Sequence, residues 1–382
     1  MKKSRDRAFL YSCVFIGISW IVAVVSRIKF NGLIFGFDYG IYQPDGVHYT
    51  FRSLVFQGVD MNEAAIRVAD WYQRNSFKLN DIDPSGILPQ NNGAWGLVKP
   101  RVLYPILSVP FVFLLGIPGM LVVPCLALLI LMIYPLSFGR DRRTLVLACL
   151  LSFSLSLSPT VMRWMVTNCT DSLLAGLFCL YLWVSGAKRV GKRDYVMIAV
   201  LAILTTSMTR FCLPFWLALA IGSFLRREIL KGIFISALSV ICSLPAILST
   251  GTSGVSPAVT NAGILTKIAE VPINFIKVSC IEFLELAALD RLLLFLLCLS
   301  VVIAIKSSNK RESQDFLLML LAGLFVGALN GTLGVNFRYQ LPVLAYLVPV
   351  ILNTDFTTRS TVSNMKSRIF DHKPAQPKNS QK

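Results

Sequence analysis

The sequence has few charged residues and few side chains that bind metals. Only 15% of its 382 residues are Asp, Glu, Lys or Arg, whereas soluble domains carry about 25%. Its two histidines, His48 and His372, cannot build a histidine-based metal site, and its nine cysteines include no CxxC or Cys/His ligand spacing. P-loop, dinucleotide-binding and nucleophile-elbow motifs are missing as well, so nothing indicates ATP hydrolysis or a redox cofactor.

Apolar residues are abundant instead, at 55%, and basic residues interrupt them. Lys and Arg outnumber Asp and Glu by 37 to 20, which gives a formal net charge of +17. The basic residues cluster in short breaks between apolar runs and in the two terminal segments, as the positive-inside rule expects of cytoplasmic loops. This distribution argues against a nucleic-acid partner and predicts an all-α polytopic membrane protein.

The charge pattern also predicts the topology of the first third of the chain. The basic segment at 1–7 should stay in the cytoplasm, so a first span at about 8–27 leads outward. A large first outer loop follows at 28–117. An odd number of crossings must then reach the basic break at 139–143, so residues 102–115 are interpreted as a short helix in the outer leaflet, ended by Gly and Pro residues.

The rest of the chain alternates between basic breaks and apolar runs, which predicts about ten spans within residues 1–352. Juxtamembrane helices are expected in the first outer loop, including an amphipathic one where Ala64, Val68 and Trp71 recur at helical spacing. A second outer loop is expected at 249–289, and residues 353–382 read as a disordered basic cytoplasmic tail. The nine later spans are expected at 118–137, 144–159, 172–187, 195–208, 211–225, 232–248, 291–305, 316–330 and 339–352.

Both termini are therefore expected in the cytoplasm. The short loops and the basic amino terminus suggest a plasma membrane, and specifically a bacterial inner membrane. Polar residues on the cytoplasmic side are explained by topology alone. Those on the outer side are not, and they are the candidates for function.

Two carboxylates and several polar aromatic residues lie just after the first span. Asp38 and Asp45 stand in a segment that also contains His48 and Tyr49. A carboxylate there can deprotonate an acceptor hydroxyl or hold a divalent cation, and tyrosines offer flat surfaces that suit sugars. The alternative is an ordinary interfacial aromatic belt with turn-forming Asp and Gly residues.

Four arginines fall at expected outer helix ends: Arg101, Arg163, Arg210 and Arg338. Together they could form a basic ring around a phosphate, although each alone is also explained as an interfacial arginine. Asp171 begins an apolar helix, where the helix dipole favours a negative charge whatever its function.

Four short motifs resemble those of the GT-C superfamily of membrane glycosyltransferases. They are Pro-Asp-Gly-Val-His-Tyr at 44–49, Lys-Pro-Arg-Val-Leu-Tyr-Pro at 99–105, the segment 168–174, and Phe-Arg-Tyr-Gln-Leu-Pro at 337–342. Members take a sugar from a polyprenyl phosphate or pyrophosphate carrier on the non-cytoplasmic side. The layout is similar over residues 8–352. The chain departs in reading Asp-Gly rather than Asp-Asp or Asp-Glu, and in having no sizeable soluble domain after the spans.

The resemblance implies roles for specific residues. Asp45 would be the catalytic carboxylate, and Asp38 would assist it or bind a cation such as Mg or Mn; no other cofactor is implied. The donor phosphate would be bound by Arg338 with Arg101, Arg163 or Arg210. The remaining residues implied in substrate binding are His48, Tyr49, Tyr104, Asp171 and Tyr339. The acceptor would be a cell-envelope glycan, lipid or protein.

Three other functions are compatible with the sequence. A polysaccharide or O-antigen polymerase would use similar donors, but it usually carries its large outer loop late in the chain. A lipid-linked-sugar transporter or flippase predicts polar residues and helix breaks at mid-membrane in matched halves. A membrane scaffold without chemistry would need only the interfacial explanations above.

Overall fold

The computed structural model describes most of the chain. Its described residues are 2–29, 41–42, 44–75, 81–91, 98–139, 141–185, 192–209, 212–250, 264–330 and 337–353. All regular secondary structure within these ranges is helical, and they contain no strand, which confirms the predicted all-α class. Residues 1–352 form one compact unit. The predicted tail at 353–382 lies, after its first residue, outside the described residues.

Three helices of the described part are long and apolar enough to cross a membrane. They are Arg7–Lys29 of α1 (Lys2–Lys29), Ile117–Phe138, and Arg311–Leu329 of α17 (Arg311–Asn330). A fourth span results if α8 (Arg142–Leu157) and α9 (Pro159–Met165), which are bent by 74°, count as one. Each of these segments coincides with a predicted span or begins within a few residues of one.

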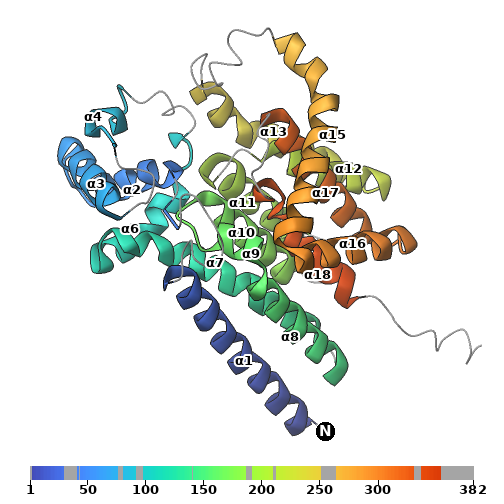
Figure 1. Cartoon of the computed structure of the whole chain (residues 1–382). Helices are drawn as coiled ribbons and strands as arrows, with labels where there is room; N and C mark the ends of the chain where they lie inside the picture. Colours follow the sequence, from blue (N-terminus) through green and yellow to red (C-terminus); the bar gives the residue numbers. More distant parts are fainter. Residues whose placement is uncertain are drawn as a thin grey trace, which may run out of the picture. The chain divides into compact units, whose positions relative to one another are not determined.

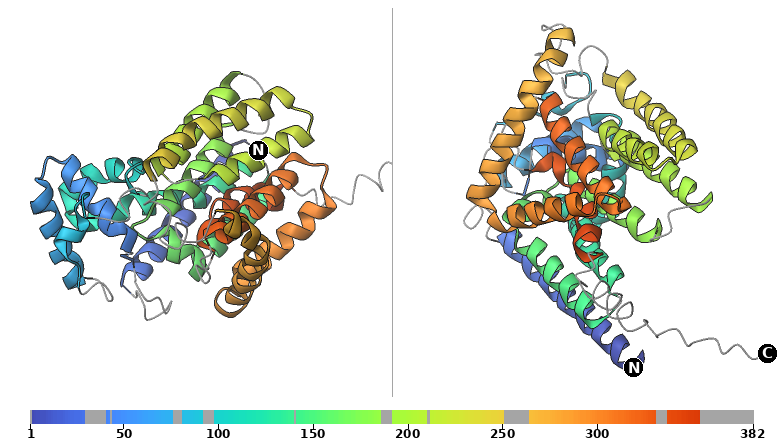
Figure 2. Two further views of the ribbon diagram at one scale, coloured as in Figure 1. Left: turned by 90° about the horizontal axis from the view of Figure 1, so that it is seen from above. Right: turned by 90° about the vertical axis from the view of Figure 1, so that its right-hand side faces the viewer.

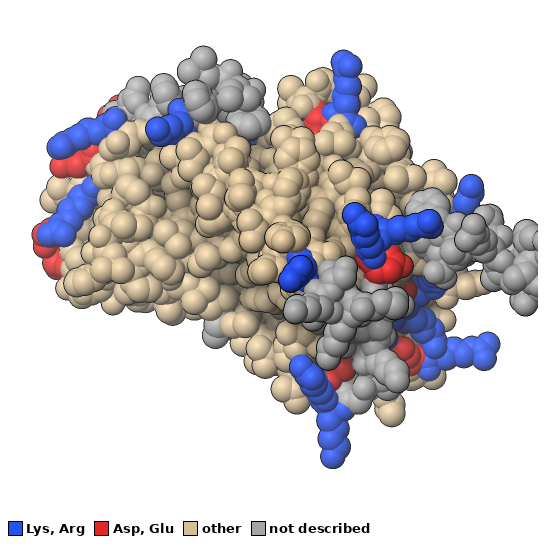
Figure 3. Space-filling view, turned by 90° about the horizontal axis from the view of Figure 1, so that it is seen from below, with Lys and Arg blue, Asp and Glu red and all other residues tan. Residues whose placement is uncertain are grey.

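Shorter apolar helices occupy the other predicted spans. They are α10 (Thr170–Ser185), α11 (Lys192–Ala202) with the π-helical η3 (Ile203–Thr209), α12 (Leu213–Leu225), α13 (Ile229–Thr250), α16 (Arg291–Lys306) and α18 (Val343–Leu352). The positions of these helices are as predicted, whereas the number that cross a membrane stays a prediction. Figure 3 shows a broad area without charged side chains on one face, with Lys and Arg gathered mainly to one side of it.

The predicted break after residue 115 is confirmed. Helix α6 (Leu103–Leu115) ends at Gly116, whose φ of 69° is left-handed and favours glycine. The chain then turns back into η1 (Ile117–Leu121), α7 (Val122–Ile133) and η2 (Tyr134–Phe138). A Cβ at Gly119 would overlap the backbone of Phe111, so this glycine allows η1 to lie directly on α6.

The predicted first outer loop contributes most residues of a second hydrophobic core. Helices α2 (Pro44–Phe56), α3 (Met61–Asn75) and α4 (Pro84–Ile87) gather beside α6 (Figure 1). Val47, Val68 and Tyr72 are among the buried residues between them. The predicted amphipathic helix is therefore present as α3. Its residues Ala64 and Val68 are buried in this core and the helix packs against α2, while its place at a membrane surface stays a prediction.

The larger core surrounds α18. Side chains on every face of this helix are buried, and α10, α16 and α17 pack against it. Asp290 links neighbouring elements, because its carboxylate caps α16 at the Leu293 N–H, 3.0 Å away, and also accepts the Thr160 N–H of α9 at 3.0 Å. Helices α1 and α8 lie side by side in every view (Figures 1 and 2).

The second outer loop differs from its prediction. Residues 264–289 form α15 (Ile264–Leu289), a 26-residue helix that packs against α16 and α17. Its buried residues Val278, Glu282 and Leu286 recur every four positions, which is the spacing of one helix face. Charged residues interrupt the apolar runs of this segment, and Pro272 lies inside it. The segment therefore contains no apolar run long enough to predict a span.

Candidate functional site

One arginine joins two carboxylates from distant parts of the sequence. Arg338, at the start of η4 (Arg338–Gln340), donates from Nη2 to Asp45 Oδ2 at 2.6 Å and from Nε to Asp171 Oδ2 at 3.0 Å. Its partners are 293 and 167 positions away in the sequence. We call these three residues the Arg338 cluster. Three residues that the sequence predicted for the site are therefore in direct contact.

The two carboxylates of the Arg338 cluster have different surroundings. The side chain of Asp171 is 1% exposed and that of Arg338 is 17% exposed, whereas Asp45 is 44% exposed. Burial is the largest single influence on the pKa of Arg338 and would lower it, but the charge and hydrogen bond of Asp45, together with Cys169 and Tyr339, outweigh burial and raise this pKa above its ordinary value. Asp171 thus orients the guanidinium from the buried side of the cluster. The Asp45 side chain is partly exposed, so an incoming group can reach it.

Helix α2 brings a second arginine to the cluster. Tyr49 lies one turn after Asp45 on α2, and its hydroxyl accepts a hydrogen bond from Arg101 Nη1 at 2.9 Å. Burial lowers the pKa of Arg101, but Tyr49 and Asp45 more than compensate and raise it, against a smaller effect of Arg338. The Arg101 charge is therefore within electrostatic reach of both Asp45 and Arg338.

Another residue of α2 holds the segment that carries Arg101. Nη1 of Arg52 donates to the carbonyls of Val98 and Lys99, at 2.7 and 2.9 Å. Two carbonyls held by one charged donor restrain the turn at this point. Helix α2 thus presents Asp45 and Tyr49 directly and restrains the turn before Arg101.

The glycine after Asp45 has a packing role. A Cβ at Gly46 would overlap the side-chain amide of Asn168. Asn168 is buried; its backbone N–H donates to the Ile41 carbonyl at 3.1 Å and its amide donates to the Tyr72 hydroxyl. Glycine at this position therefore lets α2 approach the segment before Asp171. A longer residue at position 46 would have to displace the Asn168 side chain.

An indole lies under two of the predicted arginines. The guanidinium carbons of Arg163 and Arg338 lie 4.9 and 5.1 Å from the ring centroid of Trp164, within cation–π range. Arg27, buried at the end of α1, is close enough for its charge to interact with that of Arg163. Arg27 was not among the predicted site residues. The available signal was a basic residue at the expected outer end of the first span, which the positive-inside rule does not explain.

The remaining predicted residues take other places. The Tyr104 hydroxyl donates to the Met120 carbonyl at 2.8 Å, so the structure gives it a packing role. Tyr339 is buried near Gly327 of α17. His48 is half-buried, and burial lowers its pKa although Asp45 acts in the opposite direction. Two predicted residues, Asp38 and Arg210, lie outside the described residues.

The described donor set does not fit a divalent cation. Within the described ranges no three His, Cys, Asp or Glu side chains gather in a way that could hold a metal ion. The carboxylates of Asp45 and Asp171 both bond to Arg338. The described residues alone therefore do not form a cation site, and Asp38, the residue implied in cation binding, lies outside them.

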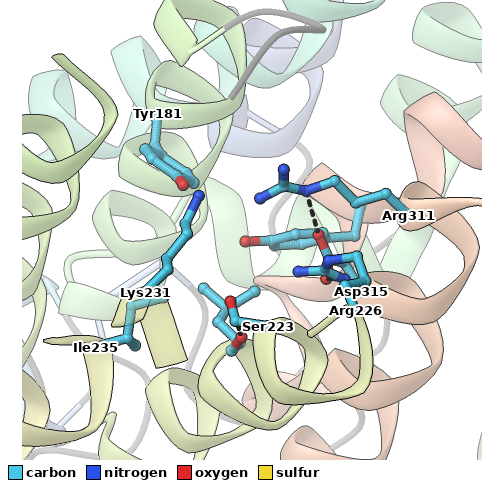
Figure 4. A pocket seen from close by; sticks show the side chains of 9 residues that line it. Tyr181, Ser223, Arg226, Lys231, Ile235, Arg311 and Asp315 are labelled. Atoms are coloured by element: carbon cyan, nitrogen blue, oxygen red, sulfur yellow. Dashed lines mark hydrogen bonds and ion pairs between the residues drawn. The ribbon is translucent and has the colours of Figure 1, made fainter. Parts of the chain in front are cut away.

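A second charged group lies among α11, α12, α13 and α17. Lys231 forms a buried ion pair with Asp194, and Arg226 Nη1 donates to Asp315 Oδ1 at 2.8 Å. Arg311 approaches Asp315 at 3.7 Å. We call these five residues the Lys231 cluster. They line or adjoin a pocket in which Lys231 and Arg311 point inward from opposite sides (Figure 4).

Chemically, the Arg338 cluster combines an accessible carboxylate with a fixed guanidinium. The carboxylate can accept a proton, and the guanidinium keeps Nη1 without a hydrogen bond to any described residue, so it can donate to a phosphate oxygen. No protein-family model, curated protein or solved structure matches the chain.

Proposed function

We propose that the chain is an integral membrane glycosyltransferase of the GT-C type. It would transfer a sugar from a polyprenyl-phosphate-linked donor to an acceptor on the non-cytoplasmic side of the plasma membrane. The observation that carries this proposal is the bridge from Arg338 to Asp45 and Asp171. The bridge supports the proposal because direct glycosyl transfer from a phosphate requires a carboxylate that can accept a proton close to a side chain that can bind the phosphate.

In the proposed reaction, Asp45 accepts the proton of an acceptor hydroxyl. The hydroxyl oxygen attacks the anomeric carbon of the donor sugar, and the bond from that carbon to the phosphate oxygen breaks. The leaving polyprenyl phosphate keeps the bonding electrons, and its charge is stabilised by Arg338 and Arg101. Asp171 holds Arg338 in place throughout, because it is buried and binds the guanidinium through Nε.

The proposed arrangement has about ten spans, both termini in the cytoplasm and the Arg338 cluster at the outer membrane surface. The apolar helices support a membrane setting. In this arrangement the donor reaches the cluster from the bilayer and the acceptor from outside. The acceptor class, a cell-envelope glycan, lipid or protein, is left open.

The test is binding of a short-chain polyprenyl phosphate to purified protein in detergent, measured as thermal stabilisation. A ligand that binds the folded state raises the melting temperature by mass action. Arg338→Lys keeps the charge but loses the fork that contacts both carboxylates, and Arg338→Ala loses both. We expect at least a tenfold weaker affinity for Arg338→Lys, which is about 1.4 kcal/mol, and a greater loss for Arg338→Ala.

Arg291→Ala is the matched control. Arg291 is an exposed arginine at the same expected membrane side and does not belong to the Arg338 cluster. The proposal predicts unchanged affinity for this variant. Failure of the folded wild type to respond to polyprenyl phosphate, or an equal loss in the Arg291 variant, would contradict it and favour a transporter or scaffold.

A further inference from the structure

A buried glutamate from α15 contacts the residue that precedes Arg338. Glu282 is 4% exposed, and its carboxylate accepts a hydrogen bond from the backbone N–H of Phe337. It lies in the middle of the buried face of α15, between Val278 and Leu286. A carboxylate on such a face is costly unless a partner compensates for it, so its position here requires an explanation.

The partner residue has an unusual backbone. Phe337 has φ 64° and ψ 10°, in the left-handed region that non-glycine residues rarely adopt. Its side chain is buried, and its carbonyl accepts the N–H of Gln340 at 3.1 Å, which closes the turn of η4. A left-handed residue at this point sets the direction in which the next side chain, that of Arg338, leaves the backbone. The geometry persists only if the surroundings hold it.

We infer that Glu282 is a positioning residue: by holding the left-handed turn at Phe337, it directs Arg338 toward Asp45 and Asp171. The inference rests on the proposed function only for its binding readout. Helix α15 would act on Arg338 through the Phe337 backbone, which Glu282 contacts. This helix would then be part of the machinery of the site.

The ionisation of Glu282 gives this contact a pH dependence. Burial is the main influence on the pKa of Glu282 and raises it to about 7. The hydrogen bond from Phe337 lowers this pKa, and the nearby charge of Glu285 raises it. An ionised carboxylate accepts an N–H more strongly than a protonated one. The contact should therefore be tighter above pH 7 and weaker below it.

Other charged and titratable residues lie on the elements around Glu282. Helix α17 carries its charged residues at the end remote from Asn330. The charged or titratable residues of the described elements that adjoin α15 or Phe337 on this side are Glu285, Arg163, Asp290, Arg291, Arg338 and Tyr339.

The first test is independent of any ligand. Hydrogen–deuterium exchange of a peptide that covers residues 337–341 reports whether the turn is held. We expect at least tenfold faster exchange in Glu282→Ala, and less than threefold faster exchange in Glu282→Gln, because the Gln Oε1 can still accept the N–H. Glu270→Gln is the matched control, since Glu270 is exposed on the same helix. Unchanged exchange in Glu282→Ala overturns the inference whatever the protein binds.

The second test uses short-chain polyprenyl phosphate between pH 6 and pH 8. The phosphate of the probe titrates in the same way for every variant. A difference between the pH profiles of two variants therefore reports the contribution of Glu282. We expect wild-type affinity to fall more steeply toward pH 6 than that of Glu282→Gln, and Glu282→Ala to bind at least tenfold more weakly at pH 8. Equal pH profiles for wild type and Glu282→Gln would contradict the inference. Altered exchange without any wild-type binding would instead contradict the proposed function and leave the positioning role supported.

Discussion

The two charged clusters differ in how their carboxylates are used. In the Lys231 cluster the strongest pairs are closed: the side chains of Lys231 and Asp194 are 7% and 4% exposed, and each binds the other. In the Arg338 cluster the buried Asp171 fixes the arginine, while Asp45 stays 44% exposed. The buried pair neutralises its own charges within the helix bundle, whereas the Arg338 cluster leaves a carboxylate exposed beside a fixed arginine.

The clusters also differ in sequence separation. Lys231 and Asp194 are 37 positions apart, on helices that pack against each other. The Arg338 cluster joins residues 293 positions apart and involves the first outer loop. Ion pairs between adjacent helices compensate for charges buried in the helix bundle. Convergence of three remote segments at one arginine, with one of its two carboxylate partners exposed, is better explained by function.

The largest expected effect is on stability, in the Lys231 cluster. Lys231→Met leaves Asp194 buried without its cation, and breaking one side of a buried pair costs about 3–5 kcal/mol. Thermal unfolding in detergent measures this loss, with Lys192→Met, an exposed lysine on α11, as the control. Adding Asp194→Leu should recover most of the stability. Affinity for polyprenyl phosphate should not change, and a variant that lost binding with full stability would reverse the roles of the two clusters.

A smaller effect on stability, but a large one on binding, is expected at Gly46. Gly46→Ala must displace Asn168, and such overpacking costs about 1–3 kcal/mol. The displacement separates Asp45 from Asp171, so we expect at least tenfold weaker binding of polyprenyl phosphate in the same thermal-shift assay. Gly86→Ala is the control, because a Cβ at Gly86 meets no atom within 4 Å. Normal binding by a folded Gly46→Ala protein would show that the close approach of α2 is unnecessary.

Local features of the fold were predictable from the sequence. The break of α6 at Gly116 follows from Gly and Pro residues, and the helix at 117–138 from an apolar run. Helix α15 was not predicted because its buried face includes the charged residue Glu282 between the apolar residues Val278 and Leu286, so it does not stand out as an apolar stripe. Lys231 was missed because the positive-inside rule already accounts for a lysine near that end of a span, so its sequence position gave no sign of burial.

The contact between Asp45 and Arg338 could not be derived from spacing. Topology predicted only that both residues lie at the same membrane side, and the family resemblance suggested a shared site. Direct contact depends on packing that no local pattern encodes, namely the close approach at Gly46 and the turn at Phe337. Glu282 was missed for the same reason, since only its tertiary neighbours distinguish it from the other charged residues of its segment.

The smallest effect is expected for the exposed ion pairs of α3. Arg67 pairs with Glu63 one helical turn away, and the two side chains are 55% and 53% exposed. Such pairs contribute about 0.3–0.5 kcal/mol and weaken with salt. Arg67→Gln should therefore change the melting temperature by no more than about a degree and leave polyprenyl phosphate binding intact. If this variant bound as weakly as Arg338→Lys, the overall positive charge of the outer region, rather than the geometry of the Arg338 cluster, would account for recognition of the phosphate.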